Sequence, residues 1–185
     1  MKRLISLFIL RLFGWKLEGK WPKEVKSSVI CFAPHTSYLD GFIGKLFFWQ
    51  LGVKHKCMMS KKYFNWVTSP FLKLFGFIPV GGVKGHNAIL DATGYHKESD
   101  GLNILICPEA HLRRIENWNL GFIRIAEKAK VPIVFGYLDY RNKSGGILGY
   151  TESSEWTEVK SEIYTSYEKG WAKYPEKFEF PMNKE

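Results

Sequence analysis

Two side chains that could move a proton together stand five positions apart, His35 and Asp40. They follow a short apolar run, residues 28–32, with the composition of a buried strand. The unperturbed pKa of histidine lies near neutrality, so the imidazole can take a proton from a hydroxyl group and pass it on. A carboxylate bound to one ring nitrogen would fix the tautomer and leave the other nitrogen as the base.

The position of Asp40 also fits a purely structural role. Residues 41–49 predict a helix that begins near Ser37, so Asp40 falls in its first turn, close to the end of the strand that precedes His35. Ser37 and Asp40 have the spacing of a capping-box variant, in which the carboxylate only favours the helix N-terminus. From this pair alone the capping role is the more common of the two, and both stay open.

A second strand ends in an acidic residue in the same way. Residues 102–107 form an apolar run that stops at Pro108 and Glu109, and two such strand ends can lie side by side on a parallel sheet. Gly81 and Gly82 follow another short strand, residues 77–80, and glycines there permit positive φ and a close approach of a ligand.

The order of elements predicts the fold class. Apolar strands alternate with helices, which indicates a single α/β domain with a mixed, mostly parallel β-sheet flanked by helices on both faces. A chain of 185 residues, 45% hydrophobic, can bury one sizeable core. We divide it into an N-terminal helix and connector (1–26), the α/β domain (27–150), and a charged helix, residues 155–173, with a tail that need not be ordered (151–185).

Two apolar segments can be assigned either to the core or to a lipid. Residues 1–15 predict a helix that is apolar around most of its circumference. Its longest apolar run, residues 4–10, is far short of the ~20 residues of a membrane span, and no signal-peptide cleavage site follows it. It could lie in a lipid interface, or pack on the core or on a second subunit. The aromatic stripe of residues 61–75 is interpreted as core, although an acyl chain could use the same surface.

Charge and cysteine usage limit the partners. The net charge is +9, with the basic excess in residues 1–150, which favours an anionic partner such as a membrane surface, an acidic carrier protein or nucleic acid. Nucleic acid is disfavoured because no stripe of basic and aromatic residues is present. The three cysteines are interpreted as small core residues, which favours a reducing cytoplasm as the compartment. The spacing of the histidines does not suggest a metal site.

Four blocks in order carry a family resemblance: His35-x4-Asp40, residues 76–80, Pro108-Glu109, and residues 131–134. Over roughly residues 15–145 the chain resembles the glycerolipid acyltransferase family, which includes lysophosphatidic acid (1-acylglycerol-3-phosphate) acyltransferase, and in particular a short bacterial subgroup. The resemblance implies transfer of a fatty acyl group from acyl carrier protein or coenzyme A to a lyso-lipid hydroxyl. It implies a phospholipid-biosynthesis enzyme without other cofactors, peripheral on the inner face of the cytoplasmic membrane.

The resemblance also assigns roles. His35 becomes the general base oriented by Asp40, and Glu109 with its neighbour Ala110 shapes the acceptor site. The acceptor oxygen attacks the thioester directly, without an acyl-enzyme, which agrees with the absence of a Gly-x-Ser-x-Gly motif.

The chain departs from the family at the residues that hold phosphate. Gly81 and Gly82 stand where relatives have an acidic residue and an arginine, and residues 110–112 replace Gly-Thr-Arg. Nearby basic residues could supply the charge from shifted positions: Lys84, Arg113 and Arg114. Alternatively the acceptor lacks a phosphomonoester, which is the hypothesis that we favour. Two other functions remain open, a catalytically silent lipid-binding or carrier-binding homologue and an acyl thioesterase.

Overall fold

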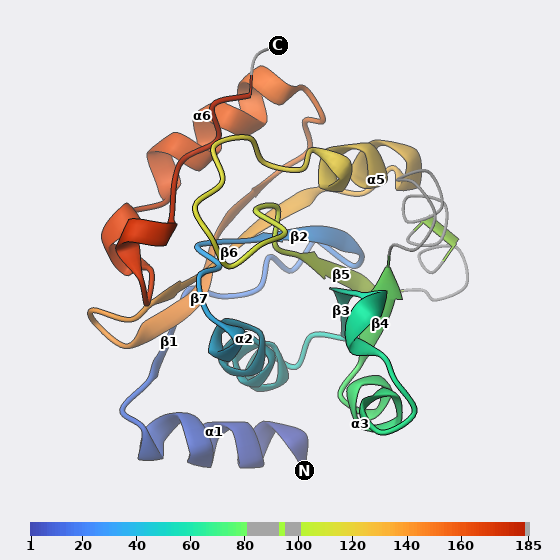
Figure 1. The fold of residues 1–185 in the computed structure, drawn as a ribbon, viewed down its shortest axis with the longest axis vertical. Helices are drawn as coiled ribbons and strands as arrows, with labels where there is room; N and C mark the ends of the chain where they lie inside the picture. The colour runs from blue at the N-terminus through green and yellow to red at the C-terminus, as the bar shows by residue number, and fades with distance from the viewer. Residues whose placement is uncertain (81–92, 95–100, 184–185) are drawn as a thin grey trace.

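Seven strands form one twisted sheet at the centre of the molecule (Figure 1). The computed structural model describes residues 1–80, 93–94 and 101–183. The strands are β1 (Lys16–Glu18), β2 (Ser28–Phe32), β3 (His55–Ser60), β4 (Phe77–Val80), β5 (Asn103–Ile106), β6 (Ile133–Asp139) and β7 (Ser144–Thr151). Their order is β1-β7-β6-β2-β5-β3-β4, and every neighbouring pair is parallel except β6 and β7. The predicted mixed, mostly parallel sheet is confirmed.

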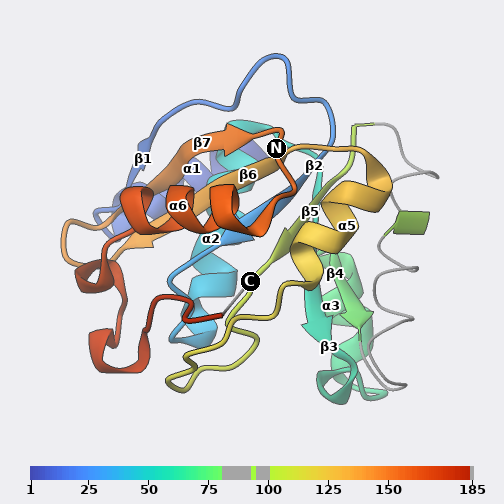
Figure 2. The same ribbon diagram turned by 90° about the horizontal axis from the view of Figure 1, so that it is seen from above.

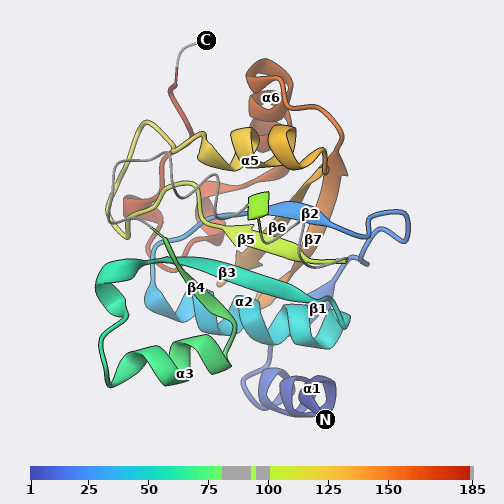
Figure 3. The same ribbon diagram turned by 90° about the vertical axis from the view of Figure 1, so that its right-hand side faces the viewer.

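Helices cover both faces of this sheet, as the sequence predicted (Figures 2 and 3). Helices α5 (Gly121–Ala129) and α6 (Trp156–Ser166) lie on one face, and α2 (Tyr38–Leu51) lies on the other. Helix α1 (Lys2–Leu12) packs on the outer side of α2, and α3 (Thr68–Leu74) lies beside strand β4. Short 3₁₀ turns complete the described elements: η1 (Lys61–Tyr63), η2 (Lys169–Trp171) and η3 (Pro175–Lys177).

Strand β2 is the centre of the core, because it pairs with β5 on one side and β6 on the other. All five of its residues are buried, as expected for a parallel strand covered on both faces. Side chains alternate between the faces: Val29 belongs to the cluster under α5 and α6, and Ile30 and Phe32 pack with the α2 residues. The register aligns Cys31 with Ile106, so the residues that follow β2 and β5 leave the same edge of the sheet.

One expectation about the C-terminal part of the chain is wrong, and a question that the sequence left open is answered. The helix expected over residues 155–173 ends at Ser166, and the chain continues in 3₁₀ turns. The tail that follows packs against the domain. Phe178 is fully buried in the cluster under α5 and α6, and the centroids of its ring and the Trp118 ring are 6.0 Å apart. The gain from burying this aromatic residue offsets the ordering of the tail. The helix expected near residues 87–97 lies largely outside the described residues.

The assignment of residues 61–75 to the core is also wrong. Trp66, Phe71 and Leu74 are exposed, although some smaller neighbours are half-buried. The reason is topological: α3 lies against β4, the last strand of the sheet, and among the described elements no second layer covers its other side. Helix α1 has one buried and one exposed side: Leu10 packs against the domain, whereas Leu4 and Phe8 face solvent.

Candidate active site

The turn from β2 into α2 brings His35 and Asp40 together. Ser37 is the N-cap residue of α2, and its hydroxyl oxygen accepts a hydrogen bond from the Leu39 N–H at 3.3 Å. Asp40 Oδ2 accepts from the Ser37 N–H at 2.8 Å, so the capping box exists. The same Oδ2 lies 3.2 Å from His35 Nδ1. The capping role and the pairing with His35 are therefore not alternatives, because one carboxylate makes both contacts.

Asp40 is fully buried, and both of its oxygens have partners. Oδ2 also accepts from the Thr36 N–H at 2.8 Å, and Oδ1 accepts from the Tyr140 hydroxyl at 2.6 Å. Backbone and hydroxyl donors satisfy both oxygens of this buried carboxylate, so Asp40 needs no contact with water. The geometry therefore fixes both the position of Asp40 and the side of the imidazole that faces it.

Tyr140 is a site residue that the sequence did not suggest. It follows strand β6, the neighbour of β2 in the sheet, and its ring packs edge-on against Trp15 with centroids 5.1 Å apart. Burial and the Asp40 charge raise the pKa of Tyr140, so its hydroxyl stays protonated and donates. Its place after the adjacent parallel strand was the only signal available, and a tyrosine there is common enough to be overlooked.

Glu109 closes the other side of the His35 loop. Its Oε1 accepts from the His35 backbone N–H at 2.8 Å, while Oε2 is buried and has no hydrogen-bond partner among the described residues. Burial raises the pKa of Glu109 to about 7, despite the opposing effect of His35. Ala110 follows with φ +57°, in the left-handed region that glycine adopts most readily. A buried acid with one unpaired oxygen is suited to meet a polar substrate group.

The environment favours the protonated form of His35. Burial disfavours the imidazolium, but the Asp40 carboxylate and the neighbouring Glu109 favour it, and the pKa of His35 is raised well above its usual value. Its side chain still exposes 20% of its surface, so the ring can be reached from solvent. Burial raises the pKa of Cys107, which keeps this neighbouring thiol protonated near neutral pH.

Arg113 and Arg114 were also predicted for the site, together with two glycines and a lysine. Arg114 forms an ion pair with Glu179 of the C-terminal tail, with Nη2 and Oε2 2.7 Å apart, and Arg113 is exposed. Gly81, Gly82 and Lys84 lie outside the described residues. Within the described ranges, no group of three or more His, Cys, Asp and Glu side chains could hold a metal ion.

The C-terminal tail supports both loops of the site. The Tyr174 N–H donates to the Thr36 hydroxyl at 3.2 Å, next to His35. Asn183 receives a hydrogen bond from the Trp118 N–H at 2.8 Å and donates to the Trp118 carbonyl at 3.1 Å, at the end of the loop that contains Glu109. The site thus has an imidazole, a buried carboxylate in contact with it and a second buried acid, held at one sheet edge by contacts from distant segments.

The chain matches one family of known proteins in sequence. The family model described as Acyltransferase matches residues 15–135, the part of the chain that contains His35, Asp40 and Glu109. No curated protein and no solved structure matches the chain. No helix among residues 1–80, 93–94 and 101–183 is long and apolar enough to cross a membrane. Because the matched residues make up well over half of the chain, the protein belongs to the acyltransferase family.

Proposed function

We propose that this acyltransferase moves a fatty acyl group from an acyl thioester to a hydroxyl of a lyso-lipid or glycerolipid precursor, as a step in phospholipid biosynthesis. The donor is acyl carrier protein or coenzyme A, as in the short bacterial glycerolipid acyltransferases that the chain resembles. The observation that carries the proposal is the contact between His35 Nδ1 and the buried Asp40, beside an unpaired oxygen of Glu109.

His35 acts as the general base. When Nδ1–H donates to Asp40, Nε2 carries the lone pair and removes the proton from the acceptor hydroxyl. The acceptor oxygen attacks the thioester carbonyl, and collapse of the tetrahedral intermediate expels the thiolate, which takes the proton from the imidazolium. The Asp40 carboxylate stabilises the imidazolium in between, and free N–H groups at the strand ends are the expected donors to the oxyanion.

The transfer is direct, without an acyl-enzyme. Cys107 is the cysteine beside His35, and burial keeps its thiol protonated. Cys107→Ser should therefore keep most of the transferase activity. Loss of activity in this variant, with an acylated cysteine trapped in the wild type by mass spectrometry, would replace direct transfer by a two-step mechanism.

The acceptor need not have a phosphomonoester. Arg114, a candidate replacement for the missing phosphate-binding arginines, is bound to Glu179 rather than turned to His35. We propose a lyso-lipid with another head group, such as an amino-acid lipid. Activity on lysophosphatidic acid that is lost in an Arg113→Ala/Arg114→Ala double variant would contradict this.

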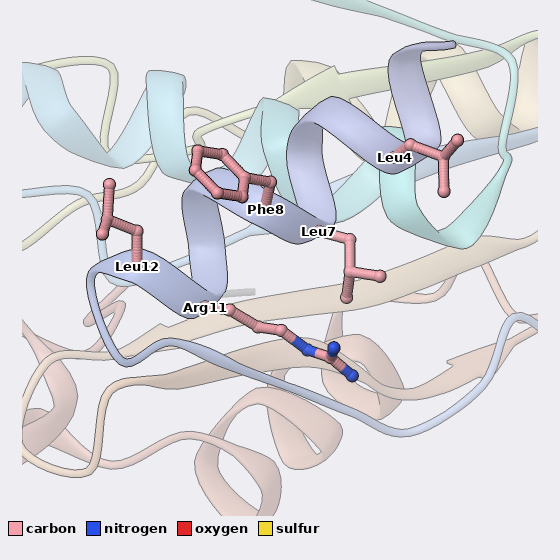
Figure 4. A pocket seen from close by; sticks show the side chains of 5 residues that line it. All are labelled: Leu4, Leu7, Phe8, Arg11 and Leu12. Atoms are coloured by element: carbon pink, nitrogen blue, oxygen red, sulfur yellow. The ribbon is translucent and has the colours of Figure 1, made fainter.

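We also propose that α1 binds the inner face of the cytoplasmic membrane. Its outer side has a surface hollow of about 440 Å³, lined by Leu4, Leu7, Phe8, Arg11 and Leu12 (Figure 4). None of these residues belongs to the His35 site, so the hollow is not a reaction chamber. Apolar side chains with an arginine among them suit a lipid interface. Phe8→Ser should weaken sedimentation with anionic vesicles.

The decisive experiment is acyl transfer from labelled acyl carrier protein or labelled acyl-CoA to a panel of lyso-lipids with phosphate and non-phosphate head groups. His35→Ala should abolish the labelled product, and Glu127→Gln, an exposed change on α5, should not. Free fatty acid formed by the wild type without any acceptor would indicate a thioesterase. Lipid binding without turnover would indicate a silent homologue.

A further inference from the structure

Helix α3 and the loop before it present bulky apolar side chains to solvent. Trp66 is 89% exposed, Phe71 64% and Leu74 77%. The loop that holds Trp66 is ordered by its own hydrogen bonds, because Asn65 Oδ1 accepts from the N–H groups of Val67 and Thr68, both at 2.9 Å. These side chains are thus held outward by a formed turn and helix, although each costs free energy in water.

The exposed side of α3 is continuous with that of α1. Trp49 of α2 connects them: Lys2 Nζ of α1 lies 5.5 Å from its ring centroid, and the Phe75 ring, directly after α3, stacks on it at 5.9 Å and 16°. Figures 1 and 3 show α1 and α3 on the same side of the sheet, away from α5 and α6. One flat partner could therefore touch both helices.

The charge of this side identifies the partner. Residues 1–17 and 41–80, which include both helices, contain no aspartate or glutamate. Three lysines near the exposed aromatic residues are themselves exposed: Lys61, Lys62 and Lys73. Lysines around protruding tryptophan, phenylalanine and leucine side chains are the pattern of a lipid interface, where the cations meet anionic head groups and the apolar tips enter below them.

We propose that α3 with Trp66 is a second membrane-contacting element, which binds an anionic bilayer together with α1. The inference rests on the proposed peripheral function and adds a contact that does not depend on the N-terminal helix. A bilayer fits better than an acidic carrier protein, because Trp66, Phe71 and Leu74 protrude separately and a fluid leaflet can take up each one without a matching pocket. The lysines then lie at the level of the lipid phosphates.

Vesicle binding tests the proposal directly. The full chain is sedimented with vesicles of phosphatidylethanolamine and phosphatidylglycerol, and with neutral phosphatidylcholine vesicles. We expect binding to the anionic vesicles that weakens with added salt. The triple variant Trp66→Ser/Phe71→Ser/Leu74→Ser should lower the partition coefficient by at least about tenfold, since three large apolar side chains no longer enter the lipid. Met182→Ser, at an exposed methionine in the C-terminal tail, is the matched control and should bind like the wild type.

Three results would overturn the proposal: no binding by the wild type, undiminished binding by the triple variant, or an equal loss in Met182→Ser. In the second case, a loss of activity in the triple variant only when the donor is acyl carrier protein would assign the surface to that protein. Far-UV circular dichroism verifies that the variants fold. Vesicle binding is measured without turnover, so it tests the membrane contact independently of the proposed reaction. The reaction itself is tested by turnover with detergent-dispersed substrates, with His35→Ala as the blank.

Discussion

Glu109 should make the stability of the protein fall as the pH rises, and Glu109→Gln should remove much of that fall. Burial raises the pKa of this carboxyl from 4.5 to about 7 in the folded chain. A raised folded-state pKa gives a contribution to stability that is complete below pH 4.5 and is lost as the pH rises through about 7. The difference corresponds to about 3 kcal/mol of unfolding free energy.

The glutamine variant preserves the geometry while it removes the titration. Its side-chain oxygen can still accept from the His35 N–H, and its amide takes the place of the unpaired Oε2 at a cost that does not depend on pH. The slope with pH, not the absolute stability, is therefore the informative quantity. The pKa of His35 is also raised, so its contribution to the unfolding free energy likewise falls as the pH rises. The difference between wild type and variant therefore measures the contribution of Glu109 together with its coupling to His35.

Urea denaturation between pH 4.5 and pH 8 measures how the unfolding free energy of each protein depends on pH. We expect the unfolding free energy of Glu109→Gln to fall by about 3 kcal/mol less than that of the wild type over this interval. Glu127→Gln, at an exposed position on α5, should follow the wild-type curve. Parallel curves for wild type and Glu109→Gln would refute the reasoning, because Glu109 would then have an ordinary pKa despite its burial.

Three further predictions concern the site and the helix that positions Asp40. The transfer rate should rise with pH to a midpoint above 6.5, because the basic form of His35 accumulates only above its raised pKa; a flat profile from pH 6 to 8 would contradict this. Tyr140→Phe removes the donor to Asp40 Oδ1 and should lower kcat about tenfold with little change in KM; undiminished kcat would mean that backbone donors alone position the carboxylate. Gly44→Ala should lower the unfolding free energy, measured in urea, by about 1 kcal/mol. The added methyl group would lie 2.7 Å from the Phe32 ring, and this overlap costs more than the ~1 kcal/mol gained in helix propensity. Equal or higher stability would show that the Phe32 ring moves aside without cost.

The elements around the site could be predicted from local patterns. The apolar runs that became β2 and β5 are bounded by proline and polar residues, and Ser37 with Asp40 marks the start of α2. Parallel strands that follow one another through helices bring their ends to one edge, which is why Glu109 was expected near His35. The roles assigned to these residues in catalysis remain predictions.

Contacts between distant segments could not be predicted. Tyr140 reaches Asp40 across 100 positions, and the Arg114 ion pair depends on the path of the tail. The apolar stripe of residues 61–75 has the composition of a core helix, and only the position of α3 at the last strand decides that Phe71 faces solvent. Periodicity describes which side of a helix is apolar, and the topology decides what covers it.

The tail that supports the two loops also affects when the site forms during synthesis. His35 and its loop leave the ribosome early. The hydrogen bonds that support the two loops form only later, because Thr36 pairs with Tyr174 and Trp118 pairs with Asn183. A nascent chain can pair its parallel strands and still have the two loops unsupported until residues 174–183 have left the ribosome. Any chemistry that depends on these loops is therefore delayed until residues 174–183 can pack against them, so acyl donors that meet a shorter nascent polypeptide encounter an unfinished site.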